Sequence, residues 1–179
     1  MTDRDITLRV PELADAPAIA AAVQSSRPEL AMWMDWCAED YDVADAVGWV
    51  QAARDARQRN LAYEFVIEGQ GGTILGCCGL NAIDTLNRRA NLGYWVRTEA
   101  TGRGVARAAA AQAIAYAFAH TELQRLEIVV AVDNAPSLAV AAALGAWREG
   151  VLVHRLAIGG RFHDAVLFAI IRGRGASPQ

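Results

Sequence analysis

Apolar and polar residues alternate in seven stretches of the chain, and stretches of helical periodicity separate several of them. Strands are expected at residues 6–10, 63–68, 73–82, 90–96, 126–132, 151–158 and 162–171. Helices are expected at about 17–26, 43–59, 105–120 and from Pro136 to Gly145. Short links make the strands between 63 and 96 antiparallel neighbours, whereas helix 105–120 joins two parallel strands. The pattern predicts a mixed, mostly antiparallel sheet of about seven strands with four helices, an α/β (α+β) fold.

Local signals place the ends of several elements. Asp15 is a candidate cap for the first helix, and Asp42 with Asp45 resembles a capping box for the second. Gly145 is a natural helix terminator, and Gly159-Gly160 predicts the turn of a closing hairpin. The aromatic and methionine cluster 30–36 has no clean period and predicts a loop or a short turn of helix.

Length and charge describe one ordinary domain. The 179 residues fit a single domain at 1–172 with a flexible tail at 173–179. A net charge of -3 and a pI near 5.6 point to neither nucleic acid nor an acidic membrane as partner. No apolar run reaches transmembrane length, and the acidic start lacks the features of a secretory signal. We expect a cytoplasmic protein whose mature chain begins at Met1.

Missing residue types exclude several chemistries. All 17 basic residues are arginine, so a Schiff-base lysine, a Walker-type phosphate loop and a protein-kinase site are impossible here. Cys37, Cys77 and Cys78 form no metal-ligand spacing, so no metal is expected. Cys77 and Cys78 alternate faces of one strand and are interpreted as small packing residues.

Residues 91–107 carry the strongest chemical signal. A strand runs into a loop in which Gly102 and Gly104 let backbone N–H groups turn inward at the start of a helix. Such a loop can hold a pyrophosphate without lysine, and Arg103 and Arg107 can add charge-assisted contacts. A glycine-softened helix start is the alternative.

A dinucleotide-binding loop of the Rossmann type competes with this interpretation. Gly102 and Gly104 lie between a strand and a helix, and Glu127 is at roughly the distance of a ribose-binding acid. However, Arg107 occupies the third glycine position, where a small residue is needed for close packing, and the loop is long for that tight turn.

A second segment, 132–145, completes the pattern. A strand ends, Asn134 follows, Ser137 lies in the first helical turn, and Gly145 comes eleven residues after Asn134. Together the two segments resemble the GNAT superfamily of acetyl-CoA-dependent N-acetyltransferases. The family's pyrophosphate motif matches Thr101–Ala106 at Gly104 and Ala106, with Thr101 in place of the usual arginine or glutamine. Leu92–Val96, the Asn134–Ser137 pair and Gly160–Asp164 resemble specifically the RimJ/RimL-type branch, which acetylates the N-termini of ribosomal proteins.

The resemblance, which spans nearly the whole chain, implies a role for particular residues. The fourth strand would splay from the fifth around a bulge, freeing backbone groups near Tyr94, Trp95 and Val96 for the pantetheine arm and the thioester carbonyl. The turn Thr101–Gly102 leads into the amides of Arg103, Gly104, Val105 and Ala106, which would hold the pyrophosphate, with Arg107 beside them. Asn134 would hydrogen-bond the pantetheine arm.

Catalytic roles follow for three residues. Many relatives carry a tyrosine seven residues after the asparagine, but Ala141 stands there in this chain. Ser137 is therefore the candidate acid for the departing thiolate, unless it only caps its helix. An α-amine has a pKa near 7.7 to 8, so its deprotonation needs only a weak general base. Glu64 and His163 are the candidate bases, acting directly or through water. A solvated strand residue is the alternative for Glu64, and a structural pair with Asp164 is the alternative for His163.

The acceptor site is expected in the aromatic cluster. Met32, Trp33 and Trp36, with Met34, are amphipathic side chains in a segment that can receive a peptide end, although each can instead fill the core.

We expect an acetyl-CoA-dependent N-acetyltransferase that acts by direct attack of a protein N-terminal α-amine on the thioester. Three alternatives stay open: acetylation of a small amine such as a polyamine, amino acid or amino sugar; a non-catalytic acyl-CoA-binding protein; and a nicotinamide-dinucleotide oxidoreductase. Homodimers are common among similar proteins, but no interface can be read from the chain.

Overall fold

A computed structural model describes residues 6–175 of the chain, so the start at Met1 and the tail residues 176–179 lie outside the described part. The strands are β1 (Thr7–Arg9), β2 (Tyr63–Glu68), β3 (Ile74–Asp84), β4 (Arg89–Val96), β5 (Arg125–Ala131), β6 (Trp147–Ile158) and β7 (Arg161–Ile171). The α-helices are α1 (Ala16–Ser25), α2 (Arg27–Leu30), α3 (Val43–Gln58), α4 (Val105–His120) and α5 (Ala135–Ala143). Three short 3-10 turns lie at Leu13–Asp15, Gln70–Gly72 and Thr98–Ala100.

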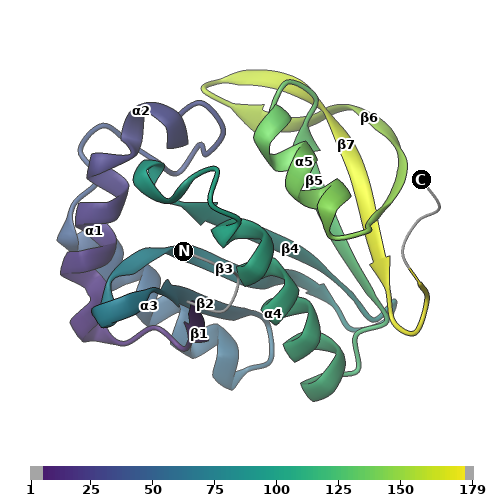
Figure 1. Ribbon diagram of the computed structural model, residues 1–179, viewed down its shortest axis with the longest axis horizontal. Coiled ribbons are helices and arrows are strands. Elements are labelled where there is room, and N and C mark those ends of the chain that lie inside the picture. The colour runs from purple at the N-terminus through teal and green to yellow at the C-terminus, as the bar shows by residue number, and fades with distance from the viewer. Residues whose placement is uncertain (1–5, 176–179) are drawn as a thin grey trace.

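The seven strands form one sheet in the order β1-β2-β3-β4-β5-β7-β6. All neighbours are antiparallel except β4 and β5, which the chain connects through helix α4. Helices α4 and α5 lie on one face of the sheet, and α1 and α3 lie on the other (Figure 1). The predicted fold class is confirmed.

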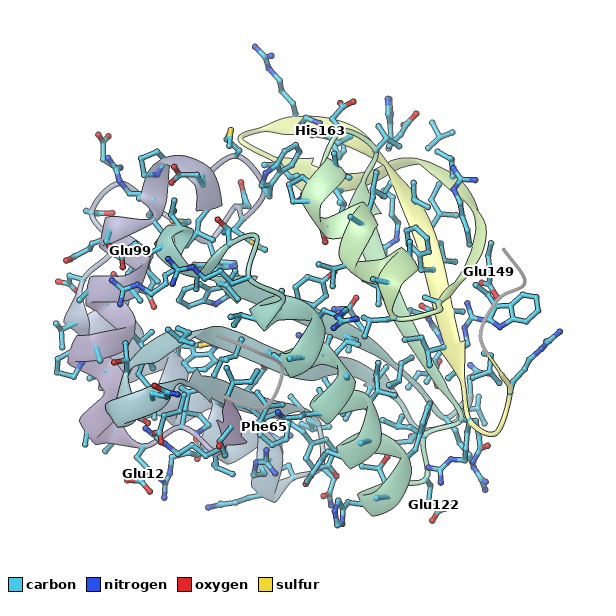
Figure 2. The ribbon with its side chains drawn as sticks, viewed as in Figure 1. Glu12, Phe65, Glu99, Glu122, Glu149 and His163 are labelled. Carbon is cyan, nitrogen blue, oxygen red and sulfur yellow. The ribbon has the colours of Figure 1, made fainter. Side chains whose placement is uncertain are left out.

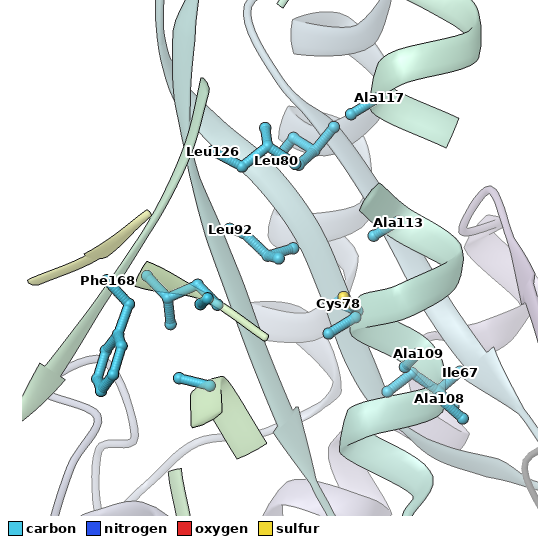
Figure 3. Packing of buried hydrophobic residues seen from close by; sticks show 14 of the residues in the cluster. Ile67, Cys78, Leu80, Leu92, Ala108, Ala109, Ala113, Ala117, Leu126 and Phe168 are labelled. Carbon is cyan, nitrogen blue, oxygen red and sulfur yellow. The ribbon is translucent and has the colours of Figure 1, made fainter. Parts of the chain in front are cut away.

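Helix α4 packs closely on the sheet because its buried face is made of alanine. Ala109, Ala113 and Ala117 are fully buried and contact the same core as Leu80 and Leu92 of the central strands (Figure 3). A methyl group is the smallest side chain that still removes apolar surface from water, so the helix axis lies near the strands. This close packing fixes the N-terminus of α4 relative to β4.

The opposite face of the sheet has a separate core. Val66, Ile74 and Cys77 pack there against Ile19 of α1 and Val50 of α3. The predicted capping box starts α3, since the Asp42 carboxylate accepts hydrogen bonds from the amides of residues 44 and 45, at 2.7 and 3.2 Å. Cys77 and Cys78 are buried on opposite faces, as the alternation predicts.

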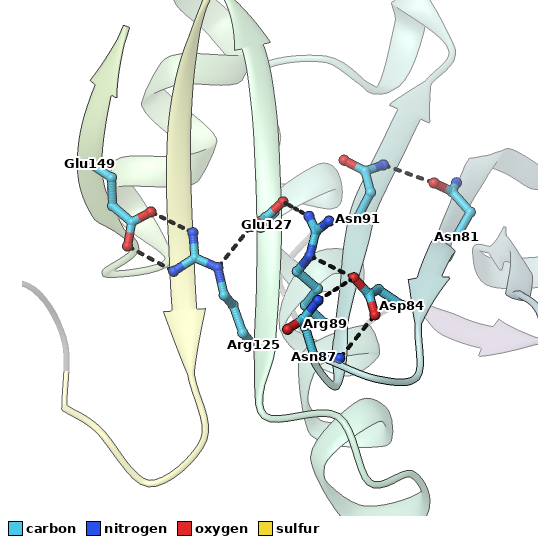
Figure 4. A network of polar contacts seen from close by, with 8 residues as sticks. All are labelled: Asn81, Asp84, Asn87, Arg89, Asn91, Arg125, Glu127 and Glu149. Atoms are coloured by element: carbon cyan, nitrogen blue, oxygen red, sulfur yellow. Dashed lines mark hydrogen bonds and ion pairs between the residues drawn. The ribbon is translucent and has the colours of Figure 1, made fainter. Parts of the chain in front are cut away.

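Strands β4 and β5 are paired only at one end. Their ladder joins residues 89–91 to 125–127, and beyond these residues the two strands separate, leaving β4 bonded only to β3 and β5 only to β7. A row of charged residues spans the paired end: Glu149, Arg125, Glu127, Arg89 and Asp84 are linked in that order (Figure 4). The splay between the fourth and fifth strands is thus confirmed, and the ion-pair row lies where it closes.

Three local predictions were wrong. Asp15 is the N-cap residue of α1 but its side chain makes no capping bond to that helix, because its carboxylate is engaged by both terminal nitrogens of Arg9 at 2.7 Å and by the Glu12 amide. The β3–β4 ladder runs without a bulge from Asn91 to Val96, and its irregularity lies between Asn81 and Asp84 instead. The expected number of four helices was one too few, because residues 27–30 form a further one-turn helix, α2, whose first turn contains Pro28.

The C-terminal end of the described chain contacts β6. The Trp147 indole N–H donates to the carbonyl of Gly175 at 3.1 Å, and the Arg174 guanidinium lies 4.4 Å from a ring centroid of Trp147. None of the helices that the structure describes between residues 6 and 175 is both long enough and apolar enough to cross a membrane.

Candidate active site

The turn before α4 presents unpaired backbone amides to solvent. Residues 101–104 are exposed, and Gly102 and Gly104 adopt left-handed backbone angles, with φ of 70° and 77°. Within residues 6–175, the amides of residues 103–106 donate no hydrogen bond. Val105 is buried and anchors the first helical turn. The arrangement is that of an anion site built from main-chain N–H groups at the positive end of a helix.

Asn134 and Ser137 lie on the other side of the gap between β4 and β5. The Asn134 side-chain oxygen accepts a hydrogen bond from the Ser137 amide at 3.1 Å and so caps α5, which leaves the Asn134 amide N–H groups free for a ligand. The Ser137 hydroxyl lies 3.0 Å from the Tyr94 hydroxyl, which also reaches the Ser137 carbonyl at 3.3 Å. The cap is therefore Asn134, and the two hydroxyls meet across the gap.

A cavity of about 510 Å³ opens on the opposite face of the sheet, between the central strands and helices α1 and α3. Its walls are largely aromatic and apolar, with Met34, Trp36, Tyr41, Trp49 and Trp95 among them. Trp36 and Trp95 are in contact, with ring centroids 6.0 Å apart. Asp35 accepts a hydrogen bond from the Gly159 amide at 3.0 Å, so the segment that carries Trp36 is attached to the β6–β7 turn.

Two glycines make the cavity floor. Gly79 of β3 pairs with Glu64 of β2 on one side and with Gly93 of β4 on the other, so the three residues form one row across the sheet. A Cβ at Gly79 would lie 1.8 Å from a Glu64 carboxylate oxygen. A Cβ at Gly93 would meet nothing closer than 3.6 Å, the Asn91 side-chain nitrogen. The Glu64 carboxylate thus lies over Gly79, and the space over Gly93 is open.

Two amides orient the Glu64 carboxylate. The Asn81 side-chain N–H donates to Glu64 Oε1 at 3.2 Å, and the Asn91 N–H donates to the Asn81 oxygen at 3.0 Å (Figure 4 shows the second bond). Burial raises the pKa of the Glu64 carboxyl above its usual value of 4.5, while the Asn81 hydrogen bond and the Arg57 charge act in the opposite direction. A carboxylate with a raised pKa and a fixed orientation is suited to accept a proton near neutral pH.

The predicted residues divide between the two sides of β4. Residues 101–107, Asn134 and Ser137 lie around the splayed end, whereas Glu64 and Trp36 line the cavity. Met32 is 55% exposed, and neither it nor Trp33 lines the cavity. His163 is also not among the lining residues; it lies on β7 opposite Leu156, near the top of the view in Figure 2. Its neighbour Asp164 accepts from the backbone amide of His154 at 2.8 Å.

Sequence reasoning missed most of the cavity. Tyr41 and Trp49 flank the predicted aromatic cluster, and composition alone could have suggested them. Asn81, Asn91 and the pair Gly79 and Gly93 carried no local signal, because their meaning lies in the pairing of strands. Trp95 was predicted for its backbone, and its side chain proves to be a wall of the cavity.

The Rossmann alternative does not fit. Both Glu127 carboxylate oxygens are occupied, one by Arg125 at 2.8 Å and the other by Arg89 at 3.0 Å, at the closed end of the strand pair. The sheet also has a single parallel pair where a dinucleotide fold needs several. A mostly antiparallel sheet that opens beside a helix N-terminus instead offers room for an extended, phosphate-bearing ligand between two strands.

Comparison with known proteins agrees with this arrangement. The family model described as "Acetyltransferase (GNAT) domain" matches residues 5–146. The chain is 31% identical over 175 residues to the Bacillus subtilis (strain 168) protein named "Putative ribosomal N-acetyltransferase YdaF", covering 93% of this chain and 91% of that one. The chain therefore belongs to the GNAT family of N-acetyltransferases, and the resemblance to the ribosomal branch is supported.

Two further similarities bear on the ligands. The structure of RimL, a ribosomal L7/L12 α-N-protein acetyltransferase in complex with coenzyme A, superposes with a TM-score of 0.88 at 25% identity and covers 94% of both chains. The spermidine N(1)-acetyltransferase of Vibrio cholerae is 25% identical over 169 residues, covering 94% of each chain. Relatives thus include enzymes named for protein and for polyamine acceptors.

Proposed function

We propose that this protein transfers the acetyl group of acetyl-CoA to the N-terminal α-amine of a protein. The observation that carries the choice of acceptor is the charge of the cavity. Among the lining residues that the structure describes, Glu64 is the single carboxylate and none is basic. One carboxylate among aromatic walls suits one ammonium group, whereas a polyamine brings several cations that would need several acidic partners.

The splayed end fits acetyl-CoA. The free amides of Arg103, Gly104, Val105 and Ala106 would hold the pyrophosphate, and the Arg103 and Arg107 side chains would add positive charge. The Asn134 amide and the backbone groups of residues 94–96 on the side away from β3 would bind the pantetheine arm. Bound acetyl-CoA supplies an acetyl thioester, whose C–S bond breaks as the C–N bond of the product forms.

The residues on the two sides of β4 would handle the protons. Glu64 accepts the proton that the acceptor amine loses, directly or through one water, and the aromatic walls exclude bulk solvent. Ser137 donates a proton to the leaving sulfur and takes one from the Tyr94 hydroxyl 3.0 Å away, which solvent then reprotonates. Burial raises the pKa of Tyr94 to about 12, so this hydroxyl keeps its proton throughout the neutral range.

The proposal is tested by free-thiol release from acetyl-CoA across a panel of acceptors. N-terminal peptides with a free α-amine should give the highest kcat/KM, and the same peptides with a blocked N-terminus should give none. Spermidine and amino sugars should be at least about 10-fold poorer, because their further cations meet no carboxylate. Preferred acetylation of spermidine would contradict the acceptor assignment, and coenzyme binding without thiol release for any amine would identify a non-catalytic protein.

Replacing Ser137 by alanine separates the catalytic role from capping. The cap uses the Ser137 backbone amide, which alanine retains, so α5 should remain intact. We expect kcat to fall about 100-fold, the lower end of the range typical of a general acid, with little change in the acetyl-CoA dissociation constant. An unchanged kcat would remove Ser137 from the mechanism and leave Tyr94 as the candidate acid.

A further inference from the structure

Glu64, Gly79 and Gly93 form a row across the sheet, and its two glycines have no side chains on the cavity face. Strands favour β-branched and aromatic residues, and two glycines facing each other on central strands weaken the sheet. Both glycines are on the face of the cavity, and the residues before and after them on that face, Cys77, Asn81, Asn91 and Trp95, all carry side chains. The missing side chains therefore create one local hollow beside the Glu64 carboxylate.

The space over Gly79 is filled, whereas the space over Gly93 is open. At Gly79 the space is already occupied, since the Glu64 carboxylate comes within 1.8 Å of where a Cβ would be. At Gly93 the space is free, with the nearest atoms being the side-chain nitrogens of Asn91 at 3.6 Å and Asn81 at 3.9 Å. Neighbouring strands are about 5 Å apart, so an atom over Gly93 is within direct or one-water reach of the carboxylate.

We propose that Gly93 is the floor of the subsite for the acceptor nitrogen, and that Gly79 and Asn81 are positioning residues that hold the Glu64 carboxylate beside it. The proposal rests on the proposed function, because it takes Glu64 as the base. Gly93 belongs to β4, the strand that separates from β5, so a nitrogen over it lies next to the strand edge along which the acetyl donor would run. The subsite admits an unhindered primary amine.

Gly93→Ala is the main test. The added methyl meets only ordinary contacts in the free protein, so the variant should fold and bind acetyl-CoA as the wild type does. In the reaction it would occupy the amine position, and we expect the KM for an N-terminal peptide to rise at least 10-fold. Gly48→Ala is the matched control, since a Cβ there, on α3, has nothing within 4 Å and should leave the kinetics unchanged.

Gly79→Ala and Asn81→Ala test the positioning role. The first displaces the carboxylate and the second removes its hydrogen-bond donor, so kcat should fall about 10-fold or more while acetyl-CoA affinity is retained. A merely structural role would lower thermal stability without this selective loss of kcat. Asn81→Gln, which keeps the amide, gives a second variant should alanine fail to fold.

The outcomes separate this inference from the proposed function. If the wild type acetylates peptides and Glu64→Gln is inactive, but Gly93→Ala shows a wild-type KM, the subsite is wrong and the function stands. If Gly93→Ala and Gly79→Ala behave as expected, both are supported. A wild type that releases no thiol with any amine overturns both.

Discussion

Replacing Gly104 by valine should abolish acetyl-CoA binding while the protein remains folded. Gly104 has a φ of 77°, a left-handed conformation that costs a β-branched residue on the order of 1–2 kcal/mol or more, so the loop will shift to escape it. The shift moves the amides of residues 103–106 away from the pyrophosphate. Hydrogen bonds to charged groups contribute about 1.5–3 kcal/mol each, so the loss of two predicts at least about 100-fold weaker binding.

Calorimetric titration with acetyl-CoA measures this effect, and Gly71→Val is the matched control. Gly71 has a φ of 69° in an exposed turn, with nothing within 4 Å of where its Cβ would be. It carries the same backbone strain in the turn between β2 and β3, outside the loop before α4. Affinity that falls equally in both variants would reflect general destabilisation, and unchanged affinity in Gly104→Val would refute the loop as the phosphate site.

Glu64→Gln should reduce kcat/KM by about 100- to 10,000-fold, the range associated with a general base. Glutamine keeps the shape of the side chain and its acceptor oxygen for Asn81, so acetyl-CoA binding should be unchanged. His163→Gln should stay within about threefold of wild type, because His163 does not line the cavity. Glu122→Gln, an exposed glutamate at the far end of the sheet, is the matched control for the substitution itself.

The pH profile provides a further check. Burial raises the pKa of Glu64, so this carboxyl should contribute an acid limb of kcat/KM above the usual glutamate value of 4.5. The acceptor α-amine, with a pKa near 7.7 to 8, adds a limb of its own, and only the Glu64 contribution should disappear in Glu64→Gln. Arg57 on α3, whose guanidinium donates to the backbone carbonyl of Glu64 at 3.2 Å, acts on this carboxyl through its positive charge. Cys77 and Cys78 on β3 are buried thiols whose raised pKa values keep them neutral. Tyr41 and Tyr94, which also line the cavity, have pKa values near 12 and do not titrate in this range.

The Glu64→Gln variant should be at least as thermally stable as the wild type although its activity falls. A carboxyl whose pKa is raised on folding adds stability below pH 4.5, and this contribution is lost as the pH rises through the raised value. At pH 7 the buried carboxylate is therefore a cost that glutamine removes. The melting temperature of Glu64→Gln should equal or exceed that of the wild type, and a clearly lower value would show that Glu64 is chiefly structural.

Much of the fold was predictable because its signals are local. Helix α4 begins and ends where the alanine-rich periodicity predicts, and the Asp42–Asp45 capping box starts α3. The shape of the loop proposed to bind phosphate was also predictable, since a single turn of chain contains the glycines, the free amides and the helix start. Asp15 is instructive in the opposite sense: its spacing suits a helix cap, but Arg9, brought near by the first strand, offers a stronger charged partner.

The acceptor side was only partly predictable. Glu64 and Trp36 were singled out for their chemistry, but nothing in their surroundings along the chain distinguished Glu64 from a solvated strand residue. The structure shows that Glu64 faces a cavity because α1 and α3 cover that face of β2 and leave a hollow above the glycines.

The sequence by itself therefore determined most elements, the capping of α3, and the turn that exposes amides before α4, because each depends on residues within a few positions of one another. The tertiary structure alone decided that Glu64, Gly79 and Gly93 form one row and that Asn81 and Asn91 hold it in place. Alternation shows which residues share a face of one strand, but the register between strands is set by the packing of the whole sheet, and that register makes the site.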